Sequence, residues 1–126
     1  MTNSKIIRED IERIEEAYEF MLAYAAQGRA EEGAGPDGAH IRNFLNQFLE
    51  ATQNIMSNAG KISAAYKVSD AFFSNFENDG NTMKSILAML LQKDNISSEM
   101  IDNANGLITV RSYLTSLFFI DKALLD

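Results

Sequence analysis

Apolar residues recur every three or four positions along most of the chain, which is the spacing of one face of an α-helix. Within residues 3–27 the intervals alternate between four and three, a seam typical of closely packed helices, at Ile7, Ile11, Ile14, Tyr18, Met21 and Ala25. The single proline is Pro36, and runs of β-branched residues are scarce. This periodicity predicts an all-α fold, an antiparallel bundle of four to five helices that forms one domain over residues 1–126.

Turn-forming residues divide the periodic pattern into rods. The first two expected helices run from Asn3 or Ser4 to Gln27 and from about Asp37 to Asn58, with Asp37 as the cap of the second. A third covers residues 61–77, a shorter fourth follows Asn81 and ends near Lys93, and the last begins after Asn95, capped by Ser97 or Ser98. The tetrapeptide Asn-Asp-Gly-Asn favours a turn, so the third long rod is predicted to break near residues 78–81. Inside the last helix, residues 103–106 are poor helix formers. Three alternatives follow: a kink, a close helix contact, or a helix that starts at Asn105.

One segment offers no apolar face. GRAEEGAGPDGA, residues 28–39, combines glycines, a proline and acids. Such a composition buries too little apolar area to offset the entropy lost on ordering. We therefore expect residues 28–37 to be a flexible loop between the first two helices.

The chain ends on its most apolar stretch, YLTSLFFIDKALLD, residues 113–126. On a helical projection Leu114, Leu117 and Leu125 share one face, while Phe119 falls toward another side. A helix that faces a single core needs an apolar arc of about 100°, and this one is wider. Either the last helix lies centrally among the others, or part of it contacts a second chain. We expect a core role, with an interface along the edge.

Charged and aromatic residues away from the apolar stripes are candidates for a binding surface. The first helix has an acidic outer face, and off-stripe aromatic residues are typical of interfaces. Arg111 and Asp121 fall within or beside the apolar arc of the last helix, where a charge needs a partner. We expect Arg111 to pair with an acid of another helix or to anchor a binding surface. The candidate interface residues are Glu12, Glu16, Glu19, Phe20, Tyr24, Phe73, Arg111 and Phe119.

The sequence contains few residues that could form a catalytic or metal site. His40 is the single histidine, whereas di-iron bundles need two Glu-x-x-His motifs and catalytic zinc commonly uses two or three histidines. A phosphotransfer histidine belongs in mid-helix, whereas His40 lies at a helix start, so we expect it to be solvent-exposed. The chain has no cysteine, and no serine or threonine stands beside an evident base. We expect no metal, no cofactor and no enzymatic activity.

Charge and hydropathy restrict the partners and the compartment. A net charge of −7 and a pI near 4.6 repel phosphate backbones, so nucleic acid is not an expected partner. No apolar run approaches the roughly 20 residues of a membrane helix, and the charged N-terminus does not resemble a secretory signal. With no cysteine to demand an oxidising compartment, the sequence predicts a cytoplasmic protein without a membrane partner.

Two functions remain. The leading hypothesis is a non-enzymatic accessory or regulatory protein that binds a larger protein or enzyme, or a second copy of itself, and affects assembly, stability or activity. The alternative is a helical bundle that senses a small molecule or signal in an internal pocket, which six Met and the aromatic residues could line.

Overall fold

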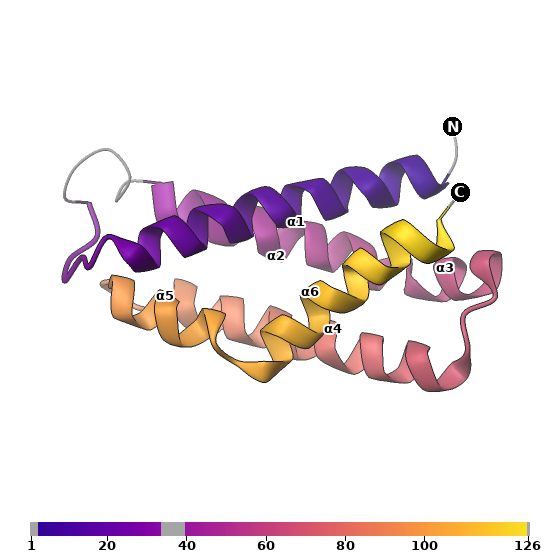
Figure 1. Ribbon diagram of the computed structural model, residues 1–126. Helices are drawn as coiled ribbons and strands as arrows, with labels where there is room; N and C mark the ends of the chain where they lie inside the picture. The colour runs from indigo at the N-terminus through magenta and orange to yellow at the C-terminus, as the bar shows by residue number, and fades with distance from the viewer. Residues whose placement is uncertain (1–2, 34–39, 126) are drawn as a thin grey trace.

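A computed structural model describes residues 3–33 and 40–125. Its helices are α1 (Asn3–Ala26), α2 (Ile41–Ser57), α3 (Ala59–Tyr66), α4 (Asp70–Leu91), α5 (Ser98–Asn105) and α6 (Ile108–Phe119), and a π-helical turn (Ile120–Leu124) follows. They form four antiparallel rods, namely α1, α2 with α3, α4, and α5 with α6 (Figure 1). The start of α1 and the end of α6 lie at the same end of the bundle (Figure 1). The predicted all-α bundle is confirmed.

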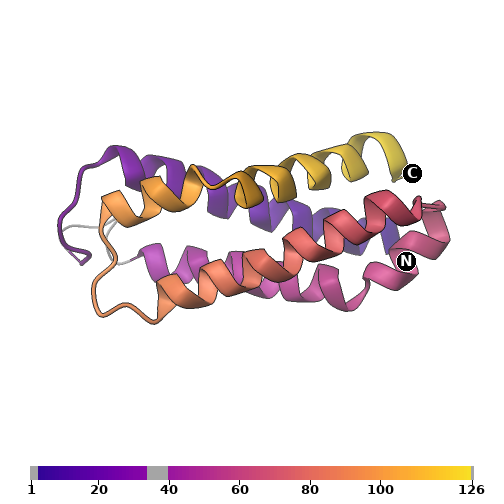
Figure 2. The same ribbon diagram turned by 90° about the horizontal axis from the view of Figure 1, so that it is seen from below.

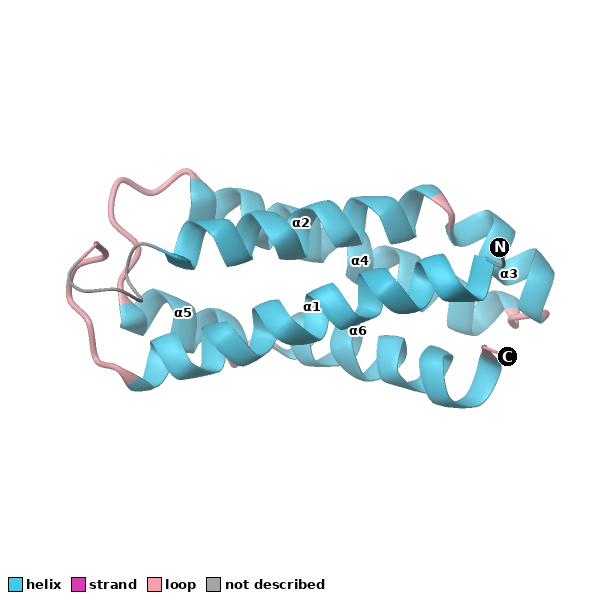
Figure 3. Cartoon of the chain, turned by 90° about the horizontal axis from the view of Figure 1, so that it is seen from above, coloured by secondary structure: helices cyan, strands magenta, loops and turns pink. Residues whose placement is uncertain are grey.

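The rods surround one core. α1 packs on α2, α2 on α4, α4 on α6, and α5 on α1 (Figures 2 and 3). The seam predicted for α1 faces this core, where Ile7, Ile11, Ile14 and Met21 are buried. α2 contributes its own buried stripe, which includes Ile41, Leu45, Phe48 and Ile55. No helix within the described residues is long and apolar enough to cross a membrane.

The predicted break near residues 78–81 is wrong, because α4 continues through them. The rod breaks instead before Ser69, where Lys67 adopts a left-handed conformation with φ 53° and the Ser69 hydroxyl caps α4 by accepting from the Phe72 amide at 3.3 Å. Gly80 is buried against the Met56 side chain. Asp79 is also buried, and its carboxylate accepts a hydrogen bond from Ser112 Oγ at 2.6 Å. Two residues that favour turns therefore serve helix packing here.

The weak run in the last rod does produce a break, between α5 and α6. Of the two serines at its start, Ser97 is the cap of α5, accepting a hydrogen bond from the Met100 amide at 3.2 Å. Asn105 at its end is buried, and its side-chain amide donates to the Met21 carbonyl of α1 at 3.3 Å. The run thus marks both an interruption and a close contact with α1.

The closing apolar stretch is mostly core. Leu114, Leu117, Ile120 and Leu125 are buried. Its apolar arc is wide because α6 also buries Tyr113. The Tyr113 ring stacks on Phe76 of α4 at 5.8 Å, and its hydroxyl donates a hydrogen bond to Thr52 Oγ1 of α2 at 3.1 Å. α6 is one of the four rods rather than a central helix, and Tyr113 reaches from it across the bundle to the opposite rod.

Candidate protein-interaction surface

A shallow apolar groove of about 260 Å³ lies between α4 and α5. Its lining residues are Ile86, Met89, Leu90 and Lys93 of α4, and Met100, Asn103, Ala104 and Leu107 from α5 and its end. We call this surface the α4–α5 groove. In both elements the lining positions follow intervals of three, one and three, the pattern of a single helical face.

The groove arises because the fourth rod changes neighbours at its break. α5 packs mainly on α1, whereas α6 packs on α4. Figure 2 shows α5 and the C-terminal half of α4 diverging from the point where α6 approaches α4. The facing sides of these two helices are therefore left open along part of their length.

Large apolar side chains at this groove remain in contact with solvent. Met89 is 58% exposed and Leu107 is 45% exposed. Ile108, which follows Leu107 at the start of α6, is 84% exposed. Exposed apolar side chains that line an apolar groove, as Met89 and Leu107 do, are typical of a binding surface.

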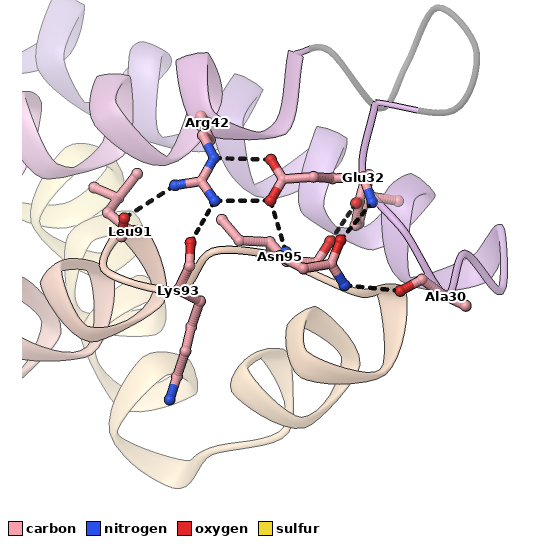
Figure 4. Close-up of polar contacts among 8 residues, drawn as sticks. Ala30, Glu32, Arg42, Leu91, Lys93 and Asn95 are labelled. Atoms are coloured by element: carbon pink, nitrogen blue, oxygen red, sulfur yellow. Dashed lines mark hydrogen bonds and ion pairs between the residues drawn. The ribbon is translucent and has the colours of Figure 1, made fainter.

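Arg42 pairs with Glu32 and contacts the main chain of Lys93, a residue of the groove lining (Figure 4). Its guanidinium binds both carboxylate oxygens of Glu32, at 2.8 and 2.7 Å, and also donates to the carbonyls of Leu91 at 3.0 Å and Lys93 at 2.5 Å. The Glu32 carboxylate accepts in addition from the Ile96 amide at 2.7 Å. These bonds join α2, the end of α4 and the connection to α5, so they hold the geometry of that end.

Electrostatics agrees with this geometry. The hydrogen bonds from the Arg42 guanidinium hold the pKa of the Glu32 carboxyl below its ordinary value, and burial opposes them only in part. Glu32 in turn raises the pKa of Arg42. The pair is therefore an ionised structural clamp rather than a proton-transfer site.

Part of the Gly-rich segment contributes to this clamp. The Glu32 amide donates to Asn95 Oδ1 at 3.0 Å, and Asn95 Nδ2 donates to the Ala30 carbonyl at 2.9 Å. Arg29 and Ser98 exchange two further hydrogen bonds, at 2.8 and 2.9 Å. The rest of the predicted loop, including the helix cap expected at Asp37, lies outside the described residues.

Three acids of the predicted surface lie in solvent on α1. Glu12, Glu16 and Glu19 are exposed, and Glu16 accepts a hydrogen bond from Gln47 Nε2 of α2 at 3.0 Å. His40, also exposed, immediately precedes α2 and makes no side-chain capping bond. The acidic outer face predicted for the first helix is therefore present.

The aromatic candidates divide between surface and core. Phe20 is half-buried and stacks on Phe44 at 4.3 Å, and Phe73 is half-buried on α4. Tyr24, in contrast, is buried, and its hydroxyl donates to the Ile96 carbonyl at 2.5 Å. The expectation that Tyr24 belongs to the surface is therefore wrong, because the connection to α5 covers its side chain.

Phe119 and Arg111 are both exposed on α6. Phe119 is 51% exposed, and its ring lies 5.5 Å from that of Phe72 at the edge of the core. Arg111 is not the buried charge that the sequence predicts. Asp121 is the partly buried one, and it pairs with Arg8, with 3.1 Å between Nε and Oδ1, and with the neighbouring Lys122 at 3.4 Å.

Sequence reasoning missed the α4–α5 groove. The apolar spacing of Leu107 and Ile108 indicates an inner helical stripe, but α6 begins at Ile108, and both side chains are exposed. The sequence does indicate that Met89 is exposed, because this residue is apolar and lies outside the inner stripe of its helix. Among residues 3–33 and 40–125, no group of three or more His, Cys, Asp or Glu side chains could hold a metal ion.

Comparisons with protein-family models, curated proteins and solved structures find no match to this chain. The inference of function therefore depends on the surface itself.

Proposed function

We propose that this chain is a non-enzymatic accessory protein that binds a larger protein and affects its assembly, stability or activity. The observation that supports this function is the α4–α5 groove with its exposed Met89 and Leu107, next to which the chain continues into the exposed Ile108. Leaving such residues in water is unfavourable, and a partner that covers them gains the free energy of burial.

The shape of the groove favours an amphipathic helix as the bound element. Two helical walls present apolar side chains at intervals of three and four, which suit a helix with apolar residues at the same spacing. Met89 and Met100 stand on opposite walls, and methionine adapts to irregular surfaces because its side chain is unbranched and flexible.

The overall charge favours a partner with a cationic surface. The net charge of −7 attracts basic protein surfaces and repels nucleic acid. Glu12 and Glu19 on the exposed face of α1 can steer such a partner during encounter. This long-range attraction is distinct from the apolar contact in the groove.

The experiment is capture from a native extract with the untagged protein and three variants. Wild type is expected to recover a stoichiometric protein, while Met89→Glu and Leu107→Glu lose it. Leu22→Glu is the matched control, because Leu22 is 46% exposed on α1 and does not line the groove. Failure to recover any stoichiometric protein, or equal loss with Leu22→Glu, would contradict the proposal.

Light scattering on wild type and Phe119→Glu tests the second possible partner, another copy of this chain. A dimer that becomes a folded monomer in the variant would identify the exposed edge of α6 as a self-association surface. If both are folded monomers, the partner is a different protein. If Phe119→Glu unfolds, the role of Phe119 is confined to the core.

A further inference from the structure

A second, more enclosed cavity of about 80 Å³ lies toward the other end of the bundle, under α3. It is lined by Ile6, Ile7, Asp10, Asn54, Ile55, Asn58, Lys61 and Ile62. Its volume exceeds the roughly 15 Å³ needed to hold one water molecule, so it can admit a small molecule. The eight-residue α3 begins directly after Asn58 and supplies Lys61 and Ile62 to the wall of the cavity.

Asp10 is the unusual member of this lining. The residue is only 7% exposed, yet the contacts of its carboxylate are long, 3.5 Å to Asn54 Nδ2 and 3.6 Å to Arg13 Nη1. The Arg13 guanidinium is shared with Glu50 at 3.3 Å. Burial raises the pKa of Asp10 above its ordinary value, although Asn54 and Arg13 act to lower it. A buried carboxylate with such weak compensation favours a closer cation.

Lys61 provides the opposite charge in the same lining. Its side chain is exposed, and among the described residues no ion pair joins it to Asp10. Between these charges the walls are apolar, formed by isoleucines of α1, α2 and α3. The side-chain amides of Asn54 and Asn58 already donate to Asp10 and to the Asn54 carbonyl, and each amide group has a second hydrogen to donate. The cavity therefore combines an inner anion, an apolar body and an outer cation.

We propose that this cavity binds a small zwitterion, an amino acid with a short aliphatic skeleton. Its ammonium group would pair with Asp10, its carbon atoms would contact the isoleucines, and its carboxylate would meet Lys61 and the Asn58 amide. A simple carboxylate lacks the group that Asp10 requires, and a simple amine places a second cation near Lys61. This site is independent of the α4–α5 groove and of the proposed function.

The test is an NMR titration of the full chain with three probes of similar size: L-alanine, propylamine and propionate. L-alanine at millimolar concentration is expected to shift amide signals of Ile6, Asp10 and Lys61, while propionate leaves them unchanged. Asp10→Asn is expected to weaken L-alanine binding about tenfold or more. Asp102→Asn, which removes an exposed acid of α5, serves as the control and keeps full affinity.

Lys61→Gln makes the test specific for a zwitterion, and its exposed position leaves the fold intact. This variant is expected to lose affinity for L-alanine and to gain affinity for propylamine, because the outer cation is gone. Absence of any shift with L-alanine in the wild type would overturn the proposal. So would equal binding of propionate, unchanged affinity in Asp10→Asn, or an unaltered preference in Lys61→Gln.

Discussion

Arg42 binds both carboxylate oxygens of Glu32 and two main-chain carbonyls at the end of α4, so one guanidinium links three segments of the bundle. Lysine cannot reproduce this planar set of donors. We predict that Arg42→Lys lowers the free energy of unfolding by about 1–2 kcal/mol, since hydrogen bonds to charged groups are lost and others are left unmet. Urea unfolding measures the change. Arg111→Lys on exposed α6 is the control, and an equal effect there would contradict the role of Arg42.

The same pair predicts a dependence of stability on pH. The pKa of Glu32 is lowered in the folded state, so its contribution is present above its ordinary value of 4.5 and is lost as pH falls through the folded pKa. Glu32→Gln is expected to be less stable than wild type at neutral pH and to lose less stability on acidification. Thermal unfolding from neutral pH to about pH 3 compares the two proteins. Parallel pH curves would contradict the prediction.

Asp10 predicts a pH dependence of stability with the opposite sign. Because burial raises its folded pKa, the ionised carboxylate lowers stability at pH values above that folded pKa. We expect Asp10→Asn to raise the free energy of unfolding at neutral pH by about 1 kcal/mol, a shift of a few degrees in Tm for a domain of this size. The difference should shrink as pH approaches 3.8, the ordinary value. A less stable Asp10→Asn at neutral pH would show that the charge itself stabilises the fold.

Substitutions at Gly80 and Met56 are expected to have non-additive effects on the free energy of unfolding. A Cβ at position 80 would overlap the end of the Met56 side chain. In an open helix Gly→Ala gains about 1 kcal/mol, and we expect Gly80→Ala to realise that gain only when Met56→Ala makes room. Urea unfolding of the wild type, both single variants and the double variant gives the coupling energy, expected to be about 0.5 kcal/mol or more. Additive effects would show that Met56 moves aside freely.

The sequence sufficed for features that one helix determines alone. The seam from Ile7 to Met21 is visible in the spacing of residues, and Ser97 caps α5 through its own backbone neighbours. The segment over residues 78–81 was misjudged because its turn propensity is overridden by partners distant in sequence, Met56 and Ser112. The helix or turn propensity of a residue does not depend on such tertiary partners, so it cannot predict their effect.

The candidate site was predictable only in part for the same reason. Exposed acids such as Glu12 and Glu19 follow from the helical projection, and Phe119 remains at the surface as expected. Tyr24 lies off the main stripe, but a later segment covers it and accepts its hydrogen bond. The α4–α5 groove required the three-dimensional path of the fourth rod, because it opens where α5 turns toward α1.

The most direct measurement of the central claim is methyl NMR of the methionines during titration with the captured partner protein. Met89 and Met100 line the α4–α5 groove, whereas Met21 and Met83 are fully buried in the core. Binding in the groove predicts that the Met89 and Met100 methyl signals shift in proportion to the partner added, while those of Met21 and Met83 stay in place. A partner that binds without moving the Met89 and Met100 signals would contradict the assignment of function to this groove.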